Sequence, residues 1–333
     1  MKRTAALALA LLSTAHAVTL TGAGASFPYP LYSRYFYEYA KREGVQVNYQ
    51  PLGSGLGQTQ FLRRTVDFGA SDTPLSAADA ARAPGRVLQV PAALGAIVVA
   101  YNLPGVTERV KLSADVLADM YLGRIRTWRD PRITGLNDGV TFPNLPVSVV
   151  HRSDASGSTQ LFSTYLAHAS ADWQRAAGIA TRLNWPGGTP ARGNDGLARI
   201  VNDTPGAIGY MELVYAARLK LPYAQLRNRA GAFVSATPAT IDEAARTATN
   251  PGSVVDAPRG YPLTSYSYLL AYADQGYGAR TEAQARALKG LLKWILTDAQ
   301  RLRVNGYQPL PEGALRDALS AVAGMTYKGK PLP

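Results

Sequence analysis

The chain has 333 residues, a formal net charge of +12 and no cysteine. Its length suits about two domains, and the lack of cysteine excludes disulfides and a lipid anchor. The lysines and arginines are scattered, with no run of five. The charge therefore favours anionic ligands in general and does not indicate a nucleic-acid-binding protein.

Residues 1–17 predict a secretory signal peptide. They begin with Lys2 and Arg3, continue with the apolar run AALALALL and end in Ala-His-Ala, with cleavage expected after Ala17. A membrane anchor would need about 20 apolar residues, and no other segment reaches that length. We therefore expect an exported, periplasmic or otherwise extracytoplasmic protein.

The mature chain alternates apolar strands with amphipathic helices. The first region predicts the strands VTL, VQVNY, VDFGAS and RVLQVP, separated by helices at 30–43, 56–64 and 76–83. The second region predicts the strands GAIVVAYN, VSVVHR and AIGYM, with helices at 113–123, 156–169 and 194–203. The strand SYLLAYA and a helix over 282–303 complete the chain. This βαβ rhythm indicates an α/β fold with largely parallel sheets.

The Gly- and Pro-containing segment TNPGSVVDAPRGYPL predicts a crossing back to the first region. We therefore expect two lobes with a cleft between them. Lobe I comprises residues 18–92 plus 253–333, and lobe II comprises residues 93–252.

Three predicted strand-to-helix junctions are rich in glycine and hydroxyl side chains: GAGASFP at 22–28, GSGLGQTQF at 53–61 and HRSDASGST at 151–159. The first turn of a helix has backbone N–H groups without partners and a partial positive charge, so it favours an anion. Arg152 adds a planar fork for a tetrahedral anion. Each junction alone could be an ordinary tight turn, but three of them at the carboxyl ends of strands indicate one anion site.

Asp72 ends the strand VDFGAS and places a carboxylate among these donors. A carboxylate beside an anion is unfavourable unless the anion carries a proton that it can donate. Hydrogen phosphates carry such a proton, and sulfate at neutral pH does not. The alternative is that Asp72 only caps the turn DTPLS.

Seven segments in this order resemble the PstS family, the periplasmic phosphate-binding protein of the bacterial phosphate ABC transporter: GAGASFP, GSGLGQTQ, VDFGASD, ADMYLGRIRTWRDPRI, HRSDASGST, RGNDGL and PGAIGYMELVYA. The resemblance covers essentially the whole mature chain. It implies a hinged, two-lobed periplasmic binding protein of the type II kind, with a mostly parallel sheet in each lobe. It also implies that the protein closes on inorganic phosphate and delivers it to a membrane-embedded ABC permease.

By motif, the resemblance assigns the phosphate contacts to Ser26, the Phe27 amide, Ser54, Asp72, Arg152, Ser156, Gly157 and Ser158. Asp154 resembles the family acid that orients the arginine, and Asn194 is expected to cap a helix facing the cleft. Ser26 and Ser158 stand where relatives often have Thr, which preserves the hydroxyl. Ala155 stands where a Gly is common.

Other functions are less well supported. A Ser-His-Asp enzyme would have to use His151 or His168, and neither is placed to reach Ser156. A two-metal phosphatase needs more clustered His and acidic ligands than this chain offers. We therefore expect a monomeric binding protein without catalytic residues, metal or cofactor. A binder of sulfate or molybdate is the nearest alternative.

Overall fold

The structure is a computed structural model that describes residues 18–250 and 253–333. The expected signal peptide lies outside the described residues. One large sheet runs through the molecule, and β12 (Tyr307–Gln308) pairs with its strand β4. Across the sheet the strands are, in order, β2 (Gln46–Gln50), β1 (Thr19–Gly24), β3 (Phe68–Ser71), β11 (Thr264–Tyr272), β4 (Val87–Tyr101), β8 (Ala207–Glu212), β6 (Ser148–Arg152) and β7 (Thr189–Ala191).

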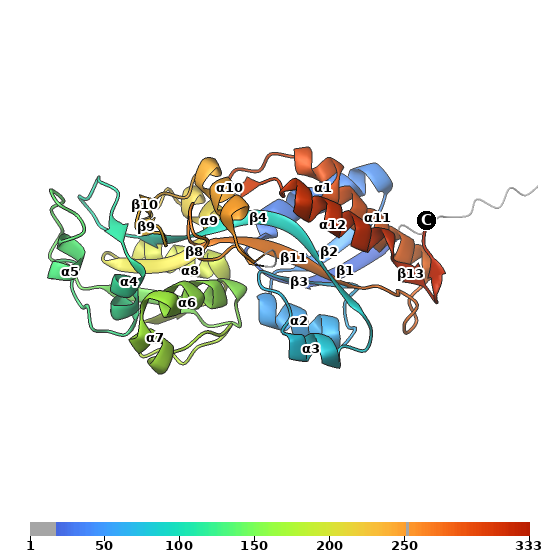
Figure 1. The fold of residues 1–333 in the computed structure, drawn as a ribbon, viewed down its shortest axis with the longest axis horizontal. Coiled ribbons are helices and arrows are strands. Elements are labelled where there is room, and N and C mark those ends of the chain that lie inside the picture. The colour runs from blue at the N-terminus through green and yellow to red at the C-terminus, as the bar shows by residue number, and fades with distance from the viewer. Residues whose placement is uncertain (1–17, 251–252) are drawn as a thin grey trace, which may run out of the picture.

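The sheet has two halves of parallel strands, and two long antiparallel strands lie between them. The strands β2, β1 and β3 are parallel, as are β8, β6 and β7. β11 is antiparallel to β3, and β4 is antiparallel to both β11 and β8. Figure 1 shows β4 and β11 crossing from one half of the molecule to the other. The expected α/β fold with parallel strands in each half is therefore confirmed.

The strand β4 differs from the sequence-based expectation. RVLQVP and GAIVVAYN were expected as two strands, but they form one strand of 15 residues. Pro91 lacks an N–H, and it lies opposite Tyr268, where the β4–β11 register shifts. The bulge accommodates the proline, so the ladder continues past it. The single strand joins both halves of the sheet.

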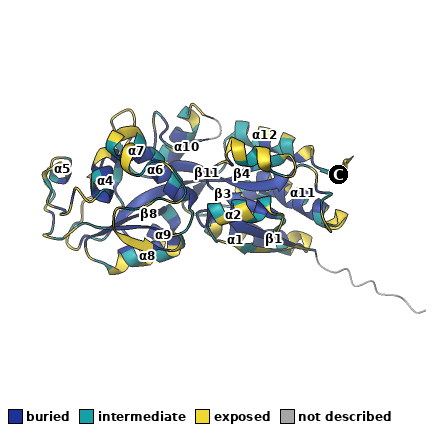
Figure 2. Cartoon of the chain, turned by 90° about the horizontal axis from the view of Figure 1, so that it is seen from below, coloured by how far each residue is buried: buried dark blue, intermediate teal, exposed yellow. Residues whose placement is uncertain are grey.

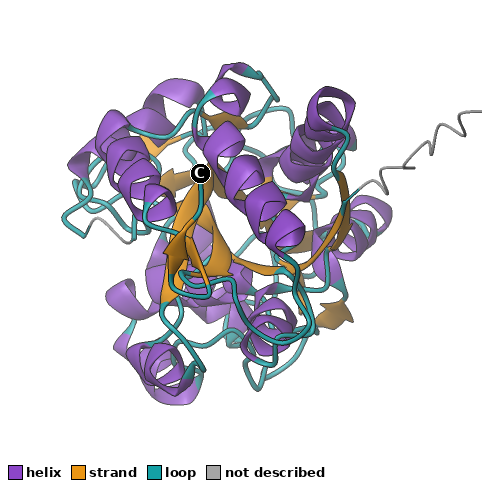
Figure 3. Ribbon diagram, turned by 90° about the vertical axis from the view of Figure 1, so that its right-hand side faces the viewer, coloured by secondary structure: helices purple, strands orange, loops and turns teal. Residues whose placement is uncertain are grey.

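Helices cover both halves of the sheet (Figures 1 and 3). Those of the first half are α1 (Tyr29–Glu43), α2 (Ser54–Leu62), α3 (Ala77–Arg82), α11 (Glu282–Leu296), the 3-10 helix η1 (Asp298–Arg301) and α12 (Glu312–Ala323). Those of the second half are α4 (Ala114–Tyr121), α5 (Pro131–Thr134), α6 (Gly157–Ala169), α7 (Ala171–Ala176), α8 (Gly193–Asp203), α9 (Leu213–Arg218) and α10 (Pro238–Thr247). Small sheets form from β5 (Lys111–Leu112), β9 (Gln225–Arg227) and β10 (Phe233–Val234), and from β13 (Thr326–Tyr327) and β14 (Lys330–Pro331).

The last predicted helix is shorter than expected. It was expected to reach residue 303, but α11 ends at Leu296. The Thr297 hydroxyl donates to the Lys293 carbonyl, and the Gln300 amide donates to the Ile295 carbonyl at 2.8 Å. These side chains satisfy carbonyls at the end of the helix, which favours a stop there.

The core extends along the whole sheet (Figure 2). Trp128 and Trp173 are fully buried and Trp294 is nearly so, while Trp185 is half-buried. Among the α1 aromatics, Tyr32 and Phe36 are buried, whereas Tyr29 and Tyr37 are exposed. Within the described part of the chain, no helix combines the length and the apolar character needed to cross a membrane.

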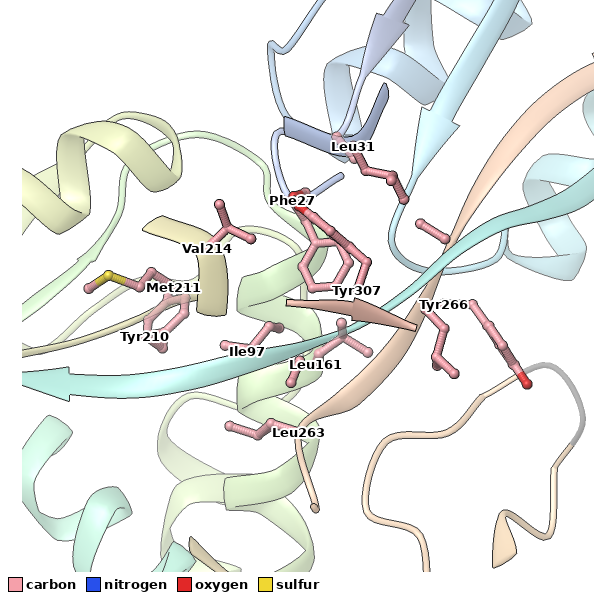
Figure 4. Packing of buried hydrophobic residues seen from close by; sticks show 14 of the residues in the cluster. Phe27, Leu31, Ile97, Leu161, Tyr210, Met211, Val214, Leu263, Tyr266 and Tyr307 are labelled. Carbon is pink, nitrogen blue, oxygen red and sulfur yellow. Dashed lines mark hydrogen bonds between the residues drawn. The ribbon is translucent and has the colours of Figure 1, made fainter. Parts of the chain in front are cut away.

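The turn before α1 is anchored in this core. Phe27 is fully buried, and its ring packs edge-on against Tyr307, with the ring centroids 6.2 Å apart (Figure 4). The Tyr307 hydroxyl donates to the Phe27 carbonyl at 2.7 Å, and the Tyr215 hydroxyl donates to the Ser26 carbonyl at 2.9 Å. The peptide groups of Ser26 and Phe27 are therefore held in fixed positions.

Candidate anion-binding site

The three predicted junctions meet where β1, β2 and β6 end, and the end of β3 joins them. Contacts between residues far apart in sequence link the four segments. The Arg152 Nη2 donates to Ser26 Oγ at 3.3 Å, and Ser54 Oγ donates to Asp72 Oδ2 at 3.2 Å. A Cβ built on Gly157 would lie 3.0 Å from Asp72 Oδ2 and 2.7 Å from Ser54 Oγ. The structure thus brings the sequence-predicted side chains into one cluster.

The cluster is almost fully shielded from solvent. Ser54 and Ser158 have no exposed surface, and Asp72 and Arg152 are 2 % and 3 % exposed. Buried polar groups normally have hydrogen-bond partners, so any that lack one indicate where a ligand binds.

The first turn of α6 supplies donors of this kind. Ser156 caps the helix, because its Oγ accepts from the Thr159 N–H at 3.3 Å. The N–H groups of Gly157 and Ser158 have no acceptor among the described residues. The Ser158 hydroxyl is buried and also has no partner there. Three donors at one helix N-terminus are therefore available to an anion.

The other two junctions add backbone donors. The Phe27 N–H has no acceptor within the described chain, and neither has the Ser54 N–H at the start of α2. The neighbouring Gly53 and Gly55 N–H groups donate instead to the carbonyls of Gly24 and Ala155. The Phe27 and Ser54 amides can therefore serve a ligand, as their positions predicted.

Arg152 is held rigidly by Asp154. Its Nε donates to Asp154 Oδ1 at 2.8 Å, and its Nη2 pairs with Asp154 Oδ2. Burial acts to raise the pKa of Asp154, but the Arg152 pair and the Gly193 N–H outweigh it and lower the pKa below the usual value. The Nη1 group has no partner among the described residues. Asp154 thus orients the Arg152 guanidinium group through Nε and Nη2, and Nη1 can donate to a ligand.

Asp72 is the acceptor of the cluster. Its Oδ1 accepts from Ser267 Oγ at 2.9 Å, and its Oδ2 accepts from Ser54 Oγ. Burial raises the pKa of Asp72 to about 7, while Ser267, Arg152 and Ser54 act in the opposite direction. The carboxyl therefore changes its proton occupancy close to neutral pH. The alternative was that Asp72 only caps the turn after β3. The side chain that bonds within this turn is instead Ser71, whose hydroxyl donates to the Thr73 carbonyl at 2.6 Å.

Asn194 does not cap its helix, contrary to expectation. The helix α8 begins at Gly193 without a side-chain cap, so Asn194 already lies within its first turn. Its Nδ2 donates to Ser26 Oγ at 3.0 Å, and its Oδ1 accepts from the Glu212 N–H at 3.0 Å. Asn194 therefore helps to hold the Ser26 hydroxyl in place, and this hydroxyl also accepts from Arg152.

Sequence analysis missed Ser267, which contacts Asp72, and the buried Glu212, whose backbone N–H contacts Asn194 but whose side chain contacts none of the predicted ligand residues. Ser267 lies on β11, 195 residues from Asp72, and the available signal was a run of hydroxyl side chains in an otherwise apolar buried strand. Glu212 is fully buried at the end of β8, and burial raises its pKa well above the usual value. Its Oε2 accepts from the Val214 N–H at 2.9 Å.

His151 and His168 lie away from this chemistry. The His151 ring stacks on Trp185, with ring centroids 4.8 Å apart, and His168 pairs with Asp256 at the far end of α6. Neither reaches Ser156. The residues that the structure describes contain no group of three or more His, Cys, Asp or Glu side chains that could hold a metal. The cluster is thus suited to binding a tetrahedral oxyanion that offers many acceptors and one proton.

Two α/β halves joined by long strands, with a buried cluster of hydrogen-bond donors between them, are typical of periplasmic solute-binding proteins. A model of the PBP superfamily domain matches residues 12–299. The phosphate-binding protein PstS of Pasteurella multocida is 38 % identical over 91 % of this chain and 89 % of its own. That of Methanocaldococcus jannaschii is 36 % identical over 90 % of this chain and 84 % of its own.

Solved structures agree on the fold. A high-affinity periplasmic phosphate-binding protein, solved with phosphate, superposes with a TM-score of 0.72 at 21 % identity, covering 95 % of this chain and 100 % of that one. A phosphate-binding protein from Stenotrophomonas maltophilia gives a TM-score of 0.66 at 19 % identity, covering 91 % and 94 %. The chain belongs to the PstS family of phosphate-binding proteins.

Proposed function

We propose that this chain captures inorganic phosphate, as mono- or dihydrogen phosphate, outside the cytoplasm and delivers it to an ABC-type permease. The observation that carries the proposal is Asp72, a buried carboxyl among donors without partners. Phosphate offers oxygens to the donors and a proton to Asp72. Sulfate would place acceptor against acceptor, which is costly in a buried site.

The proposed ligand contacts are those that the sequence predicted: Ser26, the Phe27 amide, Ser54, Asp72, Arg152, Ser156, Gly157 and Ser158. Asp154 and Asn194 act through Arg152 and Ser26. The Ser156 hydroxyl accepts from the Thr159 N–H and keeps its own proton for a phosphate oxygen. A dehydrated phosphate would thus receive hydrogen bonds from three separate segments and donate one to Asp72 in a fourth.

We propose that the two lobes, 18–92 plus 253–333 and 93–252, close over the ligand about β4 and β11. Across the cleft the Gly55 N–H donates to the Ala155 carbonyl at 3.0 Å. A Cβ on Gly55 would lie only 2.5 Å from the Ala155 Cβ, so the described form is one in which the lobes touch. Ligand contacts available only in that form would shift the population toward it.

Export by the signal peptide of residues 1–17 and action as a monomer complete the proposal. Relatives named as binding proteins support binding rather than catalysis. The test is titration calorimetry of the mature chain with phosphate, sulfate and molybdate at pH 8. One phosphate per chain and no competition by sulfate is the expected result. Preferred binding of sulfate or molybdate, or steady release of phosphate from phosphomonoesters, would contradict the proposal.

A further inference from the structure

A cavity of about 480 Å³ lies directly outside the buried site, between the two halves of the molecule. Leu56 and Thr59 of α2 line one wall, and Asp154, Ala155, Arg182 and Arg192 line the other. Asp154 and Ala155 are shared with the site, because Asp154 pairs with Arg152 and the Ala155 carbonyl accepts from Gly55. We call this cavity the mouth.

The mouth carries positive charge that no described residue neutralises. Arg182 and Arg192 are exposed, and neither has a hydrogen bond or ion pair with any described residue. Asp154 is the one acid that lines the mouth, and its charge is already paired with Arg152. An anion in the mouth would therefore meet two free guanidinium groups.

Both arginines are attached to the site through the backbone. Arg182 follows Thr181, whose carbonyl accepts from the Ser156 N–H at 2.8 Å. Arg192 precedes Gly193, whose N–H donates to Asp154 Oδ1 at 3.0 Å. The two side chains are thus carried by segments that contact the proposed ligand-binding residues, one on each side of Asp154.

We propose that Arg182 and Arg192 form an outer phosphate subsite that captures the anion before it enters the buried site. This inference rests on the proposed function. Exposed arginines are hydrated and mobile, so they hold an anion weakly and can release it inward. Uncompensated charge at a cleft mouth raises the association rate, and salt screens this effect.

The test is stopped-flow binding of inorganic phosphate to the mature chain, with intrinsic tryptophan fluorescence as the readout. In the Arg182→Gln/Arg192→Gln variant, the association rate constant should fall about three- to tenfold at low ionic strength, with an unchanged dissociation rate constant. The difference should disappear at about 1 M salt, where the Debye length is about 3 Å. Arg182→Lys/Arg192→Lys, which keeps the charge, should associate at nearly the wild-type rate.

A matched control changes the net charge equally but away from the mouth. Arg301 and Arg316 are exposed, lie outside the mouth and have no ion pair with any described residue. Arg301→Gln/Arg316→Gln should leave association nearly unchanged. Equal slowing in both double variants, or an altered dissociation rate alone, would overturn the outer subsite. A wild-type chain that binds no phosphate would instead overturn the proposed function.

Discussion

Replacing Asp72 with Asn tests the chemical basis of selectivity. The substitution keeps the shape of the side chain but exchanges one acceptor oxygen for a donating amide. Ser54 and Ser267 each donate to one Asp72 oxygen at present, and both hydroxyls can rotate to suit an amide. The variant should therefore fold, and its main change should be in the hydrogen bond to the ligand proton.

The expected size of the effect follows from the two ligands separately. Phosphate loses a hydrogen bond to a charged acceptor, which costs about 1.5–3 kcal/mol, or about ten- to hundredfold in affinity. For sulfate, the variant replaces the unfavourable contact between two acceptors with a hydrogen bond from the Asn amide. Its affinity should therefore rise by a similar factor. The preference for phosphate over sulfate should thus fall by at least about a hundredfold.

The assay is calorimetric titration of both proteins with phosphate and sulfate at pH 8. Glu212→Gln is the matched control, because Glu212 is equally buried and its raised pKa makes the amide a close mimic of the protonated acid. The control should retain its preference for phosphate. If Asp72→Asn lost phosphate affinity but still rejected sulfate, Asp72 would not be the group that distinguishes the two anions.

Three further predictions concern the same site. Arg152→Lys keeps the charge but not the guanidinium fork that contacts Asp154 and Ser26. Calorimetry should therefore show about ten- to hundredfold weaker phosphate binding. Unchanged affinity with a lower ligand-free melting temperature would mean that Arg152 is purely structural. Gly55→Ala should weaken phosphate binding at least about tenfold, because the added methyl group would crowd Ala155. The double variant Gly55→Ala/Ala155→Gly should restore the phosphate affinity. If it did not, a steric block to closure would not explain the loss. Because the Asp72 pKa is raised to about 7, sulfate should compete better at pH 5.5 than at pH 8, and a flat competition profile would contradict this.

The site could be predicted from sequence wherever its residues follow local structure. Ser26, Ser54 and Ser156 lie at strand-to-helix junctions, and Asp72 follows a strand end, so alternation of elements was enough to bring them together. Ser267 contacts Asp72 only because β11 pairs antiparallel with β3. Because the two paired strands are almost 200 residues apart in the sequence, no local sequence pattern reveals this contact.

Two other features depended on tertiary contacts for the same reason. The first turn of α8 places Asn194 beside Ser26 and Glu212, and this contact replaces the helix cap that its position suggested. The strand β4 continues through Pro91 because the bulge beside Tyr268 accepts a residue without an N–H. In both cases a partner that is distant in sequence decides the local structure.

We propose that selectivity and closure share one physical cause, the burial of Asp72. Burial raises the pKa of Asp72 from its ordinary value of 3.8 to about 7, so the described form disfavours the ionised carboxylate. Protonation favours the closed form fully below pH 3.8, and this contribution is lost as the pH rises through about 7. At pH 8 an empty cleft therefore closes at a cost, which a proton donated by phosphate offsets. Sulfate brings no proton, so we expect the same carboxylate charge to disfavour both sulfate binding and closure over it.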